Sequence, residues 1–326
     1  MDLNAKNDVE AIEAFVDKYK QLRQEIGKVI VGQDDVVKNI LMAMFSRSHA
    51  LLIGVPGLAK TLMITTIAKA VDMSYNRIQF TPDLMPSDIM GAEILDDSRN
   101  FKFVKGPIFA NIVLADEINR TPPKTQSALL EAMQERSVSM NGTTYALPDP
   151  FFVLATQNPI EQEGTYPLPE AQQDRFMFNI VLDYPSMEEE QEIVKSTIHG
   201  AMKEPDRVLT VEDIIFYQKL LQKIPVPENV YRYAVKLATL TRPGTPLAHQ
   251  WANDYLSWGA GPRASQFLII GARTHAVLGG KYSPDIEDVK AVAYNILRHR
   301  IIKNYKAEAE GITVEQIIDK LLAAAE

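Results

Sequence analysis

A short apolar run that leads through a turn of small residues into a lysine and a threonine constrains this chain more than any other feature. The run is Leu51–Ile53, and an apolar helical stretch continues from Leu62. This order is typical of a phosphate-binding loop, because backbone N–H groups at a helix N-terminus must approach a polyphosphate closely. In such a loop Lys60 would reach the β- and γ-phosphates and the Thr61 hydroxyl would ligate Mg²⁺. The candidate nucleotide-binding residues of the segment are Gly54, Val55, Pro56, Gly57, Leu58, Ala59, Lys60, Thr61 and Leu62.

The residue before the lysine departs from the phosphate-binding pattern, which has glycine where this chain has Ala59. Alanine tolerates a helical backbone, so we expect the loop to form if this position needs no positive φ. The alternative is an ordinary strand–turn–helix with a surface lysine, because short motifs also match by chance.

A second apolar run, Asn111–Ala115, ends in Asp116 and Glu117. Continuous apolar sequence is typical of a buried parallel strand, and ligands bind at the carboxyl ends of such strands. We therefore expect Asp116 to contact Mg²⁺, through water, and Glu117 to act as the base that orients the attacking water. A solvated acidic turn is the alternative, but the order of the two motifs along the chain favours the nucleotide site.

Composition excludes several classes of function. The 326 residues contain no cysteine, which excludes disulfides, thiol catalysis and thiolate metal sites. The net charge of −8 without a block of Lys and Arg argues against general binding to nucleic-acid backbones. Residues Met1–Ala5 show no signal stretch, and no apolar run approaches the ~20 residues that span a bilayer. We expect a cytoplasmic protein without a membrane span.

Helix and strand patterns alternate in the first part of the chain, which favours a parallel sheet with helices on both faces. Amphipathic helices are expected over Val9–Ile26 and from Gln33 through Phe45. A further helix is expected with Thr121 as its N-cap and Pro122 at its first position, and with Leu129, Ala132 and Met133 on its inner face. The expected strands are Ala50–Ile53, Arg77–Phe80, Asn111–Ala115, Phe151–Thr156 and Phe178–Leu182.

Two stretches predict β-hairpins inserted into this α/β core. Residues Gly91–Val104 alternate weakly around Asp97–Asn100, and Ser137–Leu147 alternate around Asn141-Gly142, a strong hairpin-turn signal.

After Leu182 the pattern becomes helical. Ser186 and Glu189 form a capping-box pattern, and further helix starts are expected at Thr210, at Pro227, at Ser283-Pro284, and at Thr313 with Gln316. We expect residues 1–184 to form the nucleotide-binding core with an N-terminal helix, and residues 185–326 to form an all-α domain of four or five helices.

Three further polar residues could carry chemistry. Asn158 follows an expected strand and could position the attacking water or contact the γ-phosphate, or simply form a turn with Pro159. Arg175 could pair with Asp174, or act as an arginine finger on a neighbouring subunit's nucleotide. Arg263 opens an expected helix, where a cation opposes the macrodipole; this either costs roughly a few tenths of a kcal/mol or indicates a nearby anion.

Four stretches together resemble the MoxR-type AAA+ ATPases: Gly54–Thr61, Asp116–Glu135, Ala155–Gln172 and Gly261–Ala264. The resemblance extends from about Ile30 to about Arg300. It implies an AAA+ αβα P-loop core with two inserted β-hairpins, of the helix-2-insert clade, followed by an all-α lid domain. It also implies assembly into a homo-oligomeric ring, usually a hexamer, and identifies Ala59 as the family's own variant.

The resemblance implies ATP and Mg²⁺ as cofactors and a Mg²⁺-dependent ATPase activity. Lys60 and Thr61 match the Walker A motif, and Asp116 and Glu117 match the Walker B motif. The segment expected near the adenine comprises Val31, Gly32 and Gln33.

The same resemblance assigns the three remaining polar residues. Asn158 matches sensor 1, Arg175 matches the arginine finger, and Arg263 matches the sensor 2 arginine, which acts within its own subunit or on the next. Family members are thought to be chaperone-like remodellers that work with von Willebrand factor A-domain partners in metal insertion or complex maturation.

Three functions remain open on the sequence. The first is an ATP-hydrolysing ring that remodels protein clients. The second is a nucleic-acid motor, which is disfavoured because the hairpin Ser137–Tyr145 contains no Lys or Arg that could grip phosphates. The third is a switch that assembles with ATP but has negligible turnover by itself.

Overall fold

The computed structural model describes residues 8–95, 101–160, 164–198 and 203–325. Contacts divide the chain into two compact units. The sheet unit comprises Lys18–Arg175 and Ile180–Phe216, and the helical unit comprises Met1–Asp17, Phe176–Asn179 and Tyr217–Glu326. The boundary expected at residue 184 stays a prediction.

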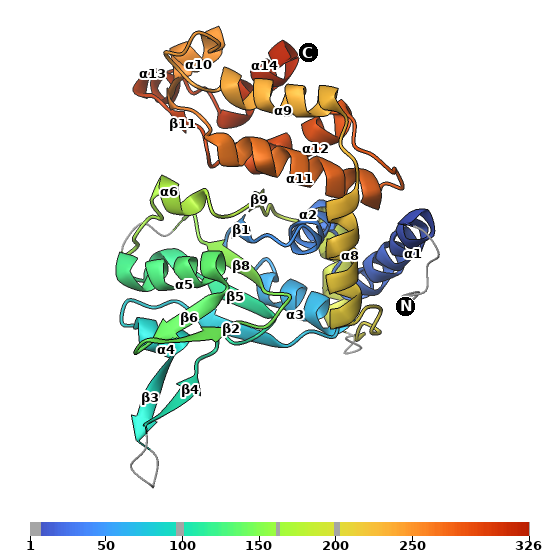
Figure 1. The fold of residues 1–326 in the computed structure, drawn as a ribbon, viewed down its shortest axis with the longest axis vertical. Coiled ribbons are helices and arrows are strands. Elements are labelled where there is room, and N and C mark those ends of the chain that lie inside the picture. Colours follow the sequence, from blue (N-terminus) through green and yellow to red (C-terminus); the bar gives the residue numbers. More distant parts are fainter. Residues whose placement is uncertain (1–7, 96–100, 161–163, 199–202, 326) are drawn as a thin grey trace. The chain divides into compact units, whose positions relative to one another are not determined.

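The sheet unit is built on a five-stranded sheet in the order β2-β5-β8-β1-β9 (Figure 1). The pairs β1–β8, β2–β5 and β5–β8 are parallel. The predicted strands and the predicted α/β class are confirmed. The strands are β1 (Ala50–Ile53), β2 (Tyr75–Gln79), β5 (Ile112–Asp116), β8 (Phe152–Gln157) and β9 (Phe178–Val181).

The strand order explains the layers. Helix α3 (Lys60–Ala70) connects β1 to β2, and helix α5 (Pro123–Glu135) connects β5 to β8, in the opposite direction across the sheet. Because such crossovers are right-handed, the two helices lie on opposite faces, as Figure 1 shows. Strand β5 is buried along its whole length, as expected for a strand covered on both faces.

Two helices precede the sheet where the amphipathic spacing predicts them. They are α1 (Asp8–Gly27), which contributes to both units, and α2 (Asp34–Phe45). Two short helices, α4 (Pro86–Met90) and α6 (Glu170–Gln173), and the 3₁₀ turn η1 (Ile118–Arg120) also lie in the sheet unit. Within the described ranges, no helix combines the length and the apolarity that crossing a bilayer requires.

The helix after β5 begins later than its pattern predicts. The assignment of Thr121 as N-cap is wrong, because Pro122 is the N-cap and Pro123 the first helical residue. Thr121 (φ −117°, ψ 152°) and Pro122 (φ −59°, ψ 154°) each precede a proline, which disfavours the helical region for the residue before it. The predicted inner face is confirmed, since Leu129, Ala132 and Met133 are buried.

Both predicted hairpins are present. Strands β3 (Gly91–Leu95) and β4 (Phe101–Lys105) pair antiparallel, as do β6 (Ser137–Met140) and β7 (Thr143–Ala146). The turn predicted at Asp97–Asn100 lies outside the described residues. At the other turn, Asn141 (φ 47°) and Gly142 (φ 83°) both have the positive φ that a type I′ turn requires.

The two hairpins contact one another. The ring of Phe103 stacks on Tyr145 with centroids 4.2 Å apart. Asn141 Nδ2 donates to Glu93 Oε2 at 2.6 Å. The inserts therefore form one joint structure beside the sheet.

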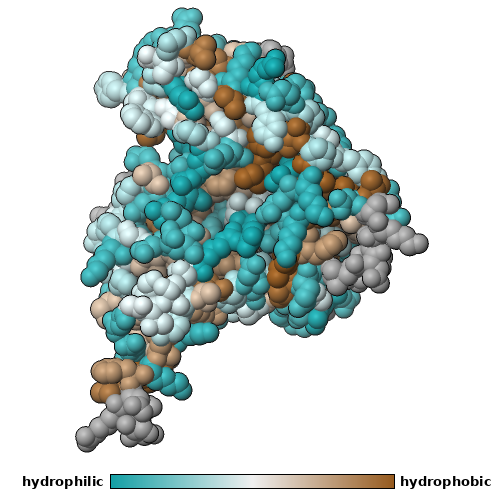
Figure 2. All heavy atoms as spheres, viewed as in Figure 1, coloured by the Kyte–Doolittle hydropathy of each residue, from teal (hydrophilic) through white to brown (hydrophobic). Residues whose placement is uncertain are grey.

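The outer end of the β3–β4 hairpin exposes apolar side chains. Ile94, Leu95 and Phe101 are 51%, 61% and 73% exposed. Leu95 lies directly opposite Phe101 across the strands, and Figure 2 shows brown, apolar surface next to the grey residues at this end. The hairpin end is therefore an apolar surface.

More helices follow residue 184 than the four or five expected, because several are short: α10 has six residues and α13 has five. An antiparallel pair, β10 (Leu256–Trp258) and β11 (Ile302–Lys303), was not predicted. The helices are α7 (Met187–Ile198), α8 (Val211–Lys223), α9 (Glu228–Leu240), α10 (Gln250–Tyr255), α11 (Pro262–Leu278), α12 (Ile286–Leu297), α13 (Tyr305–Ala309) and α14 (Val314–Ala325).

Most of the expected helix starts hold. Ser186 and Glu189 form the predicted capping box at α7, with Glu189 Oε2 accepting from Ser186 N–H at 2.8 Å. The start at Ser283-Pro284 is wrong, because α12 begins at Ile286 with Asp285 as its N-cap. Ser283 Oγ instead donates to the Pro225 carbonyl at 3.2 Å.

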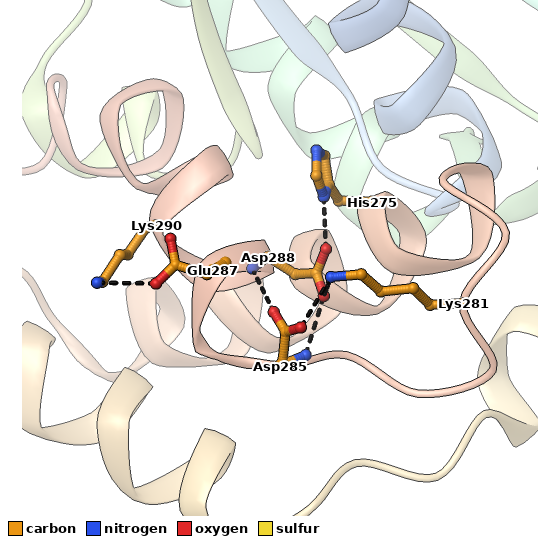
Figure 3. A network of polar contacts seen from close by, with 6 residues as sticks. All are labelled: His275, Lys281, Asp285, Glu287, Asp288 and Lys290. Atoms are coloured by element: carbon orange, nitrogen blue, oxygen red, sulfur yellow. Dashed lines mark hydrogen bonds and ion pairs between the residues drawn. The ribbon is translucent and has the colours of Figure 1, made fainter.

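A buried carboxylate joins three parts of the helical unit (Figure 3). Asp288, 1% exposed, lies 2.7 Å from His275 Nδ1 on α11 and 3.0 Å from Lys281 Nζ. Its Oδ2 also accepts from the N–H of Asp285, and its own N–H donates back to Asp285 Oδ1. One side chain thus caps α12 and ties it to α11, with its charge neutralised.

Residues just after α12 hold the start of β9 and the two residues before it. Arg300 Nη2 donates to the Phe176 carbonyl at 2.6 Å, and His299 Nε2 lies 3.1 Å from the same oxygen. Arg298 Nη1 donates to the Asn179 carbonyl at 3.2 Å. These bonds explain why Phe176–Asn179 belongs to the helical unit.

His49, immediately before β1, is buried among backbone groups. Its Nδ1 accepts from Val153 N–H at 3.0 Å, so the proton must lie on Nε2, which faces the Met133 carbonyl at 3.2 Å. Burial lowers the pKa of His49 to about 4, so the ring stays neutral in the folded protein.

This histidine predicts acid sensitivity. The folded-state pKa of about 4 lies below the unfolded value of 6.5, so the stabilisation is complete above pH 6.5 and is lost as pH falls toward 4. We expect the free energy of unfolding to drop by about 2 kcal/mol between pH 7.5 and 5.0 from this group alone. Urea unfolding at both pH values measures the drop, and His49→Gln should reduce it by that amount. An unchanged drop in the variant would contradict the assignment.

Candidate active site

A cavity of about 380 Å³ lies at the carboxyl edge of the sheet. It brings together the loop after β1 and the two acids at the end of β5, as the sequence predicts. Arg77 on β2 joins them and was not predicted. The lining residues are Pro56, Gly57, Leu58, Ala59, Lys60, Thr61, Arg77, Asp116 and Glu117.

The start of the loop requires glycine for a steric reason. A Cβ at Gly54 would lie 2.8 Å from Leu182 Cβ and 2.9 Å from the Leu182 carbonyl oxygen. Gly57 has φ +88° with open space around it, so its requirement is conformational. The turn can therefore curve tightly away from β1.

The condition set for Ala59, that its position needs no positive φ, is not met. Ala59 has φ 54° and ψ 26°, in the left-handed region, and is the N-cap of α3. This conformation costs an L-residue about 1–2 kcal/mol. The loop forms despite that cost, and the next residue, Lys60, begins the helix.

Lys60 lies folded back on its own loop. Its Nζ donates to the Gly54 carbonyl at 2.5 Å. Burial lowers the pKa of Lys60, and the nearby carboxylates of Asp116 and Glu117 oppose that shift. The ammonium group thus lies beside the two acids in the same cavity.

Both carboxylate oxygens of Asp116 are engaged. Oδ1 accepts from the Thr156 hydroxyl at 2.6 Å. Oδ2 accepts from Arg77 Nε at 3.0 Å and from Arg77 Nη2 at 2.6 Å. The side chain is therefore fixed by two neighbouring strands, β8 and β2.

Glu117 is held by one side chain from β2 and one from η1. Its Oε2 accepts from Gln79 Nε2 at 2.8 Å and from Arg120 Nη1 at 3.1 Å. Its backbone is left-handed, with φ 58° and ψ 48°, and its N–H donates to Thr156 Oγ1 at 2.9 Å. A strained non-glycine residue held by such contacts is typical of functional sites.

The donors suit a divalent cation that also binds phosphate. The Thr61 hydroxyl and the Asp116 carboxylate share the cavity and are the oxygen ligands that Mg²⁺ prefers. Among the described residues, no group of three or more His, Asp or Glu could hold a metal by itself. A cation here would need phosphate oxygens as further ligands, as Mg²⁺ usually does.

A second cavity, of about 300 Å³, adjoins the loop on its other side. Its size lies at the lower end of the range for small-molecule sites, and its lining is largely apolar, as in such sites. Gly57, Leu58 and Ala59 line both cavities. The other lining residues are Gly27, Lys28, Val29, Ile30, Val31, Gln33, Leu62, Met63, Pro185, Glu192, Ile193, Ser196, Thr197 and Lys203.

The segment expected near the adenine is tightly packed. Gly32 has φ +67°, and a Cβ there would lie 2.5 Å from Glu189 Oε1. Gln33 Nε2 donates to the Asp183 carbonyl at 2.9 Å. Val31 and Gln33 reach the second cavity, whereas Gly32 does not line it.

Three predicted polar residues lie outside both cavities, as do Gly32, Gly54 and Val55. Asn158 follows β8, is 4% exposed, and its Oδ1 accepts from Ile160 N–H at 3.1 Å, as in a turn. Arg175 Nη1 donates to the Leu130 carbonyl of α5 at 2.6 Å. Arg263 is the second residue of α11, in the helical unit.

Four residues that bind the two acids were not predicted: Arg77, Gln79, Arg120 and Thr156. Arg77 and Gln79 are two apart on β2, so their side chains point to the same face. That alternation is visible in the sequence. Its meaning depends on β2 lying beside β5, with Gln79 level with Asp116.

Two family models match the chain. Residues 49–178 match the ATPase family associated with various cellular activities (AAA), and residues 248–321 match the AAA lid domain. These matches and the parallel sheet confirm the predicted AAA core followed by a helical lid.

Curated relatives match over most of the chain. The chaperone MoxR1 of Mycobacterium tuberculosis is 43% identical over 96% of this chain and 83% of its own length. The uncharacterized protein YeaC of Bacillus subtilis is 41% identical over 92% of each chain. The protein MoxR of Methylorubrum extorquens is 29% identical over 87% of this chain and 88% of its own.

A solved structure has the same fold. The crystal structure of a candidate ATPase from Cytophaga hutchinsonii superposes with a TM-score of 0.90 at 44% identity, covering 96% of both chains. Its similarity extends over both units described above.

The left-handed backbone of Ala59 predicts a stabilising substitution. Ala59→Gly should raise the free energy of unfolding by about 1 kcal/mol, because glycine adopts this conformation without the steric cost. Urea unfolding of the full chain measures the change. The matched control is Ala68→Gly inside the same helix, which should lower stability by about 1 kcal/mol or more. A loss of stability in both variants would show that residue 59 is not strained.

Proposed function

Because the chain belongs to the MoxR family of AAA ATPases, we propose that it couples ATP hydrolysis to chaperone-like remodelling of protein partners. One observation carries the proposal. Lys60, Thr61, Asp116 and Glu117 line a single cavity that adjoins a largely apolar second cavity across the loop. Such a pair of cavities suits a molecule with a polyphosphate at one end and a flat base at the other.

The nucleotide would lie across the loop. The backbone of Gly54–Thr61 would surround the phosphates, with Lys60 exchanging its bond to the Gly54 carbonyl for phosphate oxygens. Val31, Gly32 and Gln33 would contact the adenine side. Thr61 and Asp116 would hold Mg²⁺, which when bound neutralises charge on the phosphates.

Hydrolysis would use the chain's own polar residues. Glu117 would take the proton of the attacking water, and Asn158 would orient that water through its amide. Arg175 would leave the Leu130 carbonyl and reach the nucleotide of a neighbouring subunit in a homo-oligomeric ring, usually a hexamer in this family. Arg263 would act as the sensor 2 arginine, in its own subunit or the next.

The hairpin surfaces favour a protein client over a nucleic acid. The β6–β7 hairpin carries no cation, and the end of β3–β4 presents exposed Leu95 and Phe101. Binding to a phosphate backbone needs several clustered cations, whereas exposed apolar side chains suit polypeptide. The same proposal includes three further points. They are a von Willebrand factor A-domain partner, a role in metal insertion or complex maturation, and a cytoplasmic location.

Glu117→Gln tests the catalytic assignment. The amide keeps the shape and can still accept from Gln79, but it cannot take a proton, so turnover should fall by about 10²-fold or more. ATP affinity should change little. Phosphate release and calorimetric titration measure the two quantities. Glu135→Gln, at the end of α5, is the matched control and should turn over normally. Undiminished turnover in Glu117→Gln would refute the role.

A mixing experiment tests whether the site is completed between subunits. Arg175→Ala and Glu117→Gln should each be nearly inactive, since a finger and a base are each worth several orders of magnitude. In mixed rings, a Glu117→Gln subunit still supplies Arg175 to an Arg175→Ala neighbour, so activity should return. Phosphate release across mixing ratios measures it. Gain of activity from two inactive variants cannot come from misfolding, and its absence would argue against a finger in trans.

A further inference from the structure

Resting on the proposed nucleotide site, we propose that Arg77 competes with Mg²⁺ for the carboxylate of Asp116. The chain's own guanidinium holds the metal-binding aspartate until the metal displaces it. Arg77 is thus a positioning residue that sets how strongly nucleotide binding depends on Mg²⁺.

The guanidinium of Arg77 occupies a carboxylate oxygen that the metal ion would bind. Two nitrogens of Arg77, Nε and Nη2, donate to the same oxygen of Asp116, Oδ2, at 3.0 and 2.6 Å. The Thr156 hydroxyl takes the other oxygen. Oδ2 already accepts two hydrogen bonds, so a cation or its bound water that takes this oxygen must displace Arg77.

Arg77 can leave more readily than Thr156. The Arg77 side chain is 46% exposed, whereas that of Asp116 is 13% exposed, so the guanidinium can move into water while the carboxylate stays. Thr156 is fully buried and also accepts from the Glu117 N–H, so moving it would disturb both acids. Two cations drawn to one oxygen also repel each other, which makes their binding mutually exclusive.

Two other roles could explain the ion pair. It could simply join β2 to β5, or Arg77 could turn to the phosphates themselves. A purely structural pair would change stability but leave the effect of Mg²⁺ on nucleotide binding unaltered. If Arg77 contacted the phosphates, its loss in Arg77→Met would lower the affinity for nucleotide both with and without metal.

The test is the ratio of AMP-PNP dissociation constants in EDTA and in MgCl₂. Arg77→Met should raise this ratio by about five- to tenfold relative to the wild type. In EDTA the variant leaves an unpaired carboxylate facing the phosphates, so binding weakens. In MgCl₂ the variant has no ion pair to break, so binding strengthens. Calorimetry on the intact chain gives both constants without turnover.

Two variants make the ratio specific. Arg77→Lys keeps a cation at Asp116 and should restore a ratio near that of the wild type. Arg120→Met removes a similar charge, which pairs with Glu117 instead. It also weakens binding in EDTA but leaves no stronger binding in MgCl₂, because Mg²⁺ does not displace Arg120, so its ratio should rise less than that of Arg77→Met.

Each outcome decides the matter. Stronger binding in MgCl₂ and a larger rise of the ratio in Arg77→Met than in Arg120→Met support the competition. A ratio within about twofold of the wild type, or a lower one, overturns it while leaving the nucleotide site intact. If the wild-type chain binds AMP-PNP in neither buffer, both this inference and the proposed function are overturned.

Discussion

The parallel register of β1, β8 and β5 is the constraint on which the rest of the site depends. Ile53 lies level with Gln157, and Ala115 lies level with Ala155, so the three strands end at one edge. The phosphate-binding loop, Asp116 and Thr156 meet there although they come from distant parts of the chain. Because Thr156 is level with Asp116, one hydroxyl can donate to that carboxylate and accept the Glu117 N–H. A shift of one residue would turn these side chains to the other face.

Two of the seven described non-glycine residues with positive φ lie at the same edge. Ala59 and Glu117 both have positive φ. Ala59 directly precedes helix α3, and Glu117 directly follows the buried strand β5. Non-glycine residues in this region persist only where their surroundings over-determine them. Here the buried strand β5 and the hydroxyl of Thr156 hold Glu117, and helix α3 begins directly after Ala59. The strain fixes where the loop N–H groups and the Glu117 carboxylate point, which matters more for a site than the energy it costs.

Sequence patterns predicted features that depend on neighbours along the chain and missed those that depend on strand order. The strands, hairpins and the capping box at Ser186 follow from apolar periodicity and local hydrogen bonding, and the structure confirms them. The helix start at Thr121 was wrong because the effect of two consecutive prolines outweighed the preference of threonine for caps. Arg77 could not be assigned, because its partner lies on a strand that only the sheet order brings alongside. The φ of Ala59 was likewise hidden, since alanine carries no signal for positive φ.

Charges at the site are paired with one another before any ligand arrives. Asp116 pairs with Arg77, Glu117 pairs with Arg120, and Lys60 lies on a backbone carbonyl. In the proposed site, a polyphosphate with its metal would add charge of both signs, so its binding would exchange these ion-pair partners. Arg77 also donates to Gln79, whose amide donates to Glu117, so an exchange at the first acid reaches the second through β2. On this proposal, the affinity for nucleotide would be a difference between two sets of ion pairs, and a residue could alter it without touching the phosphates.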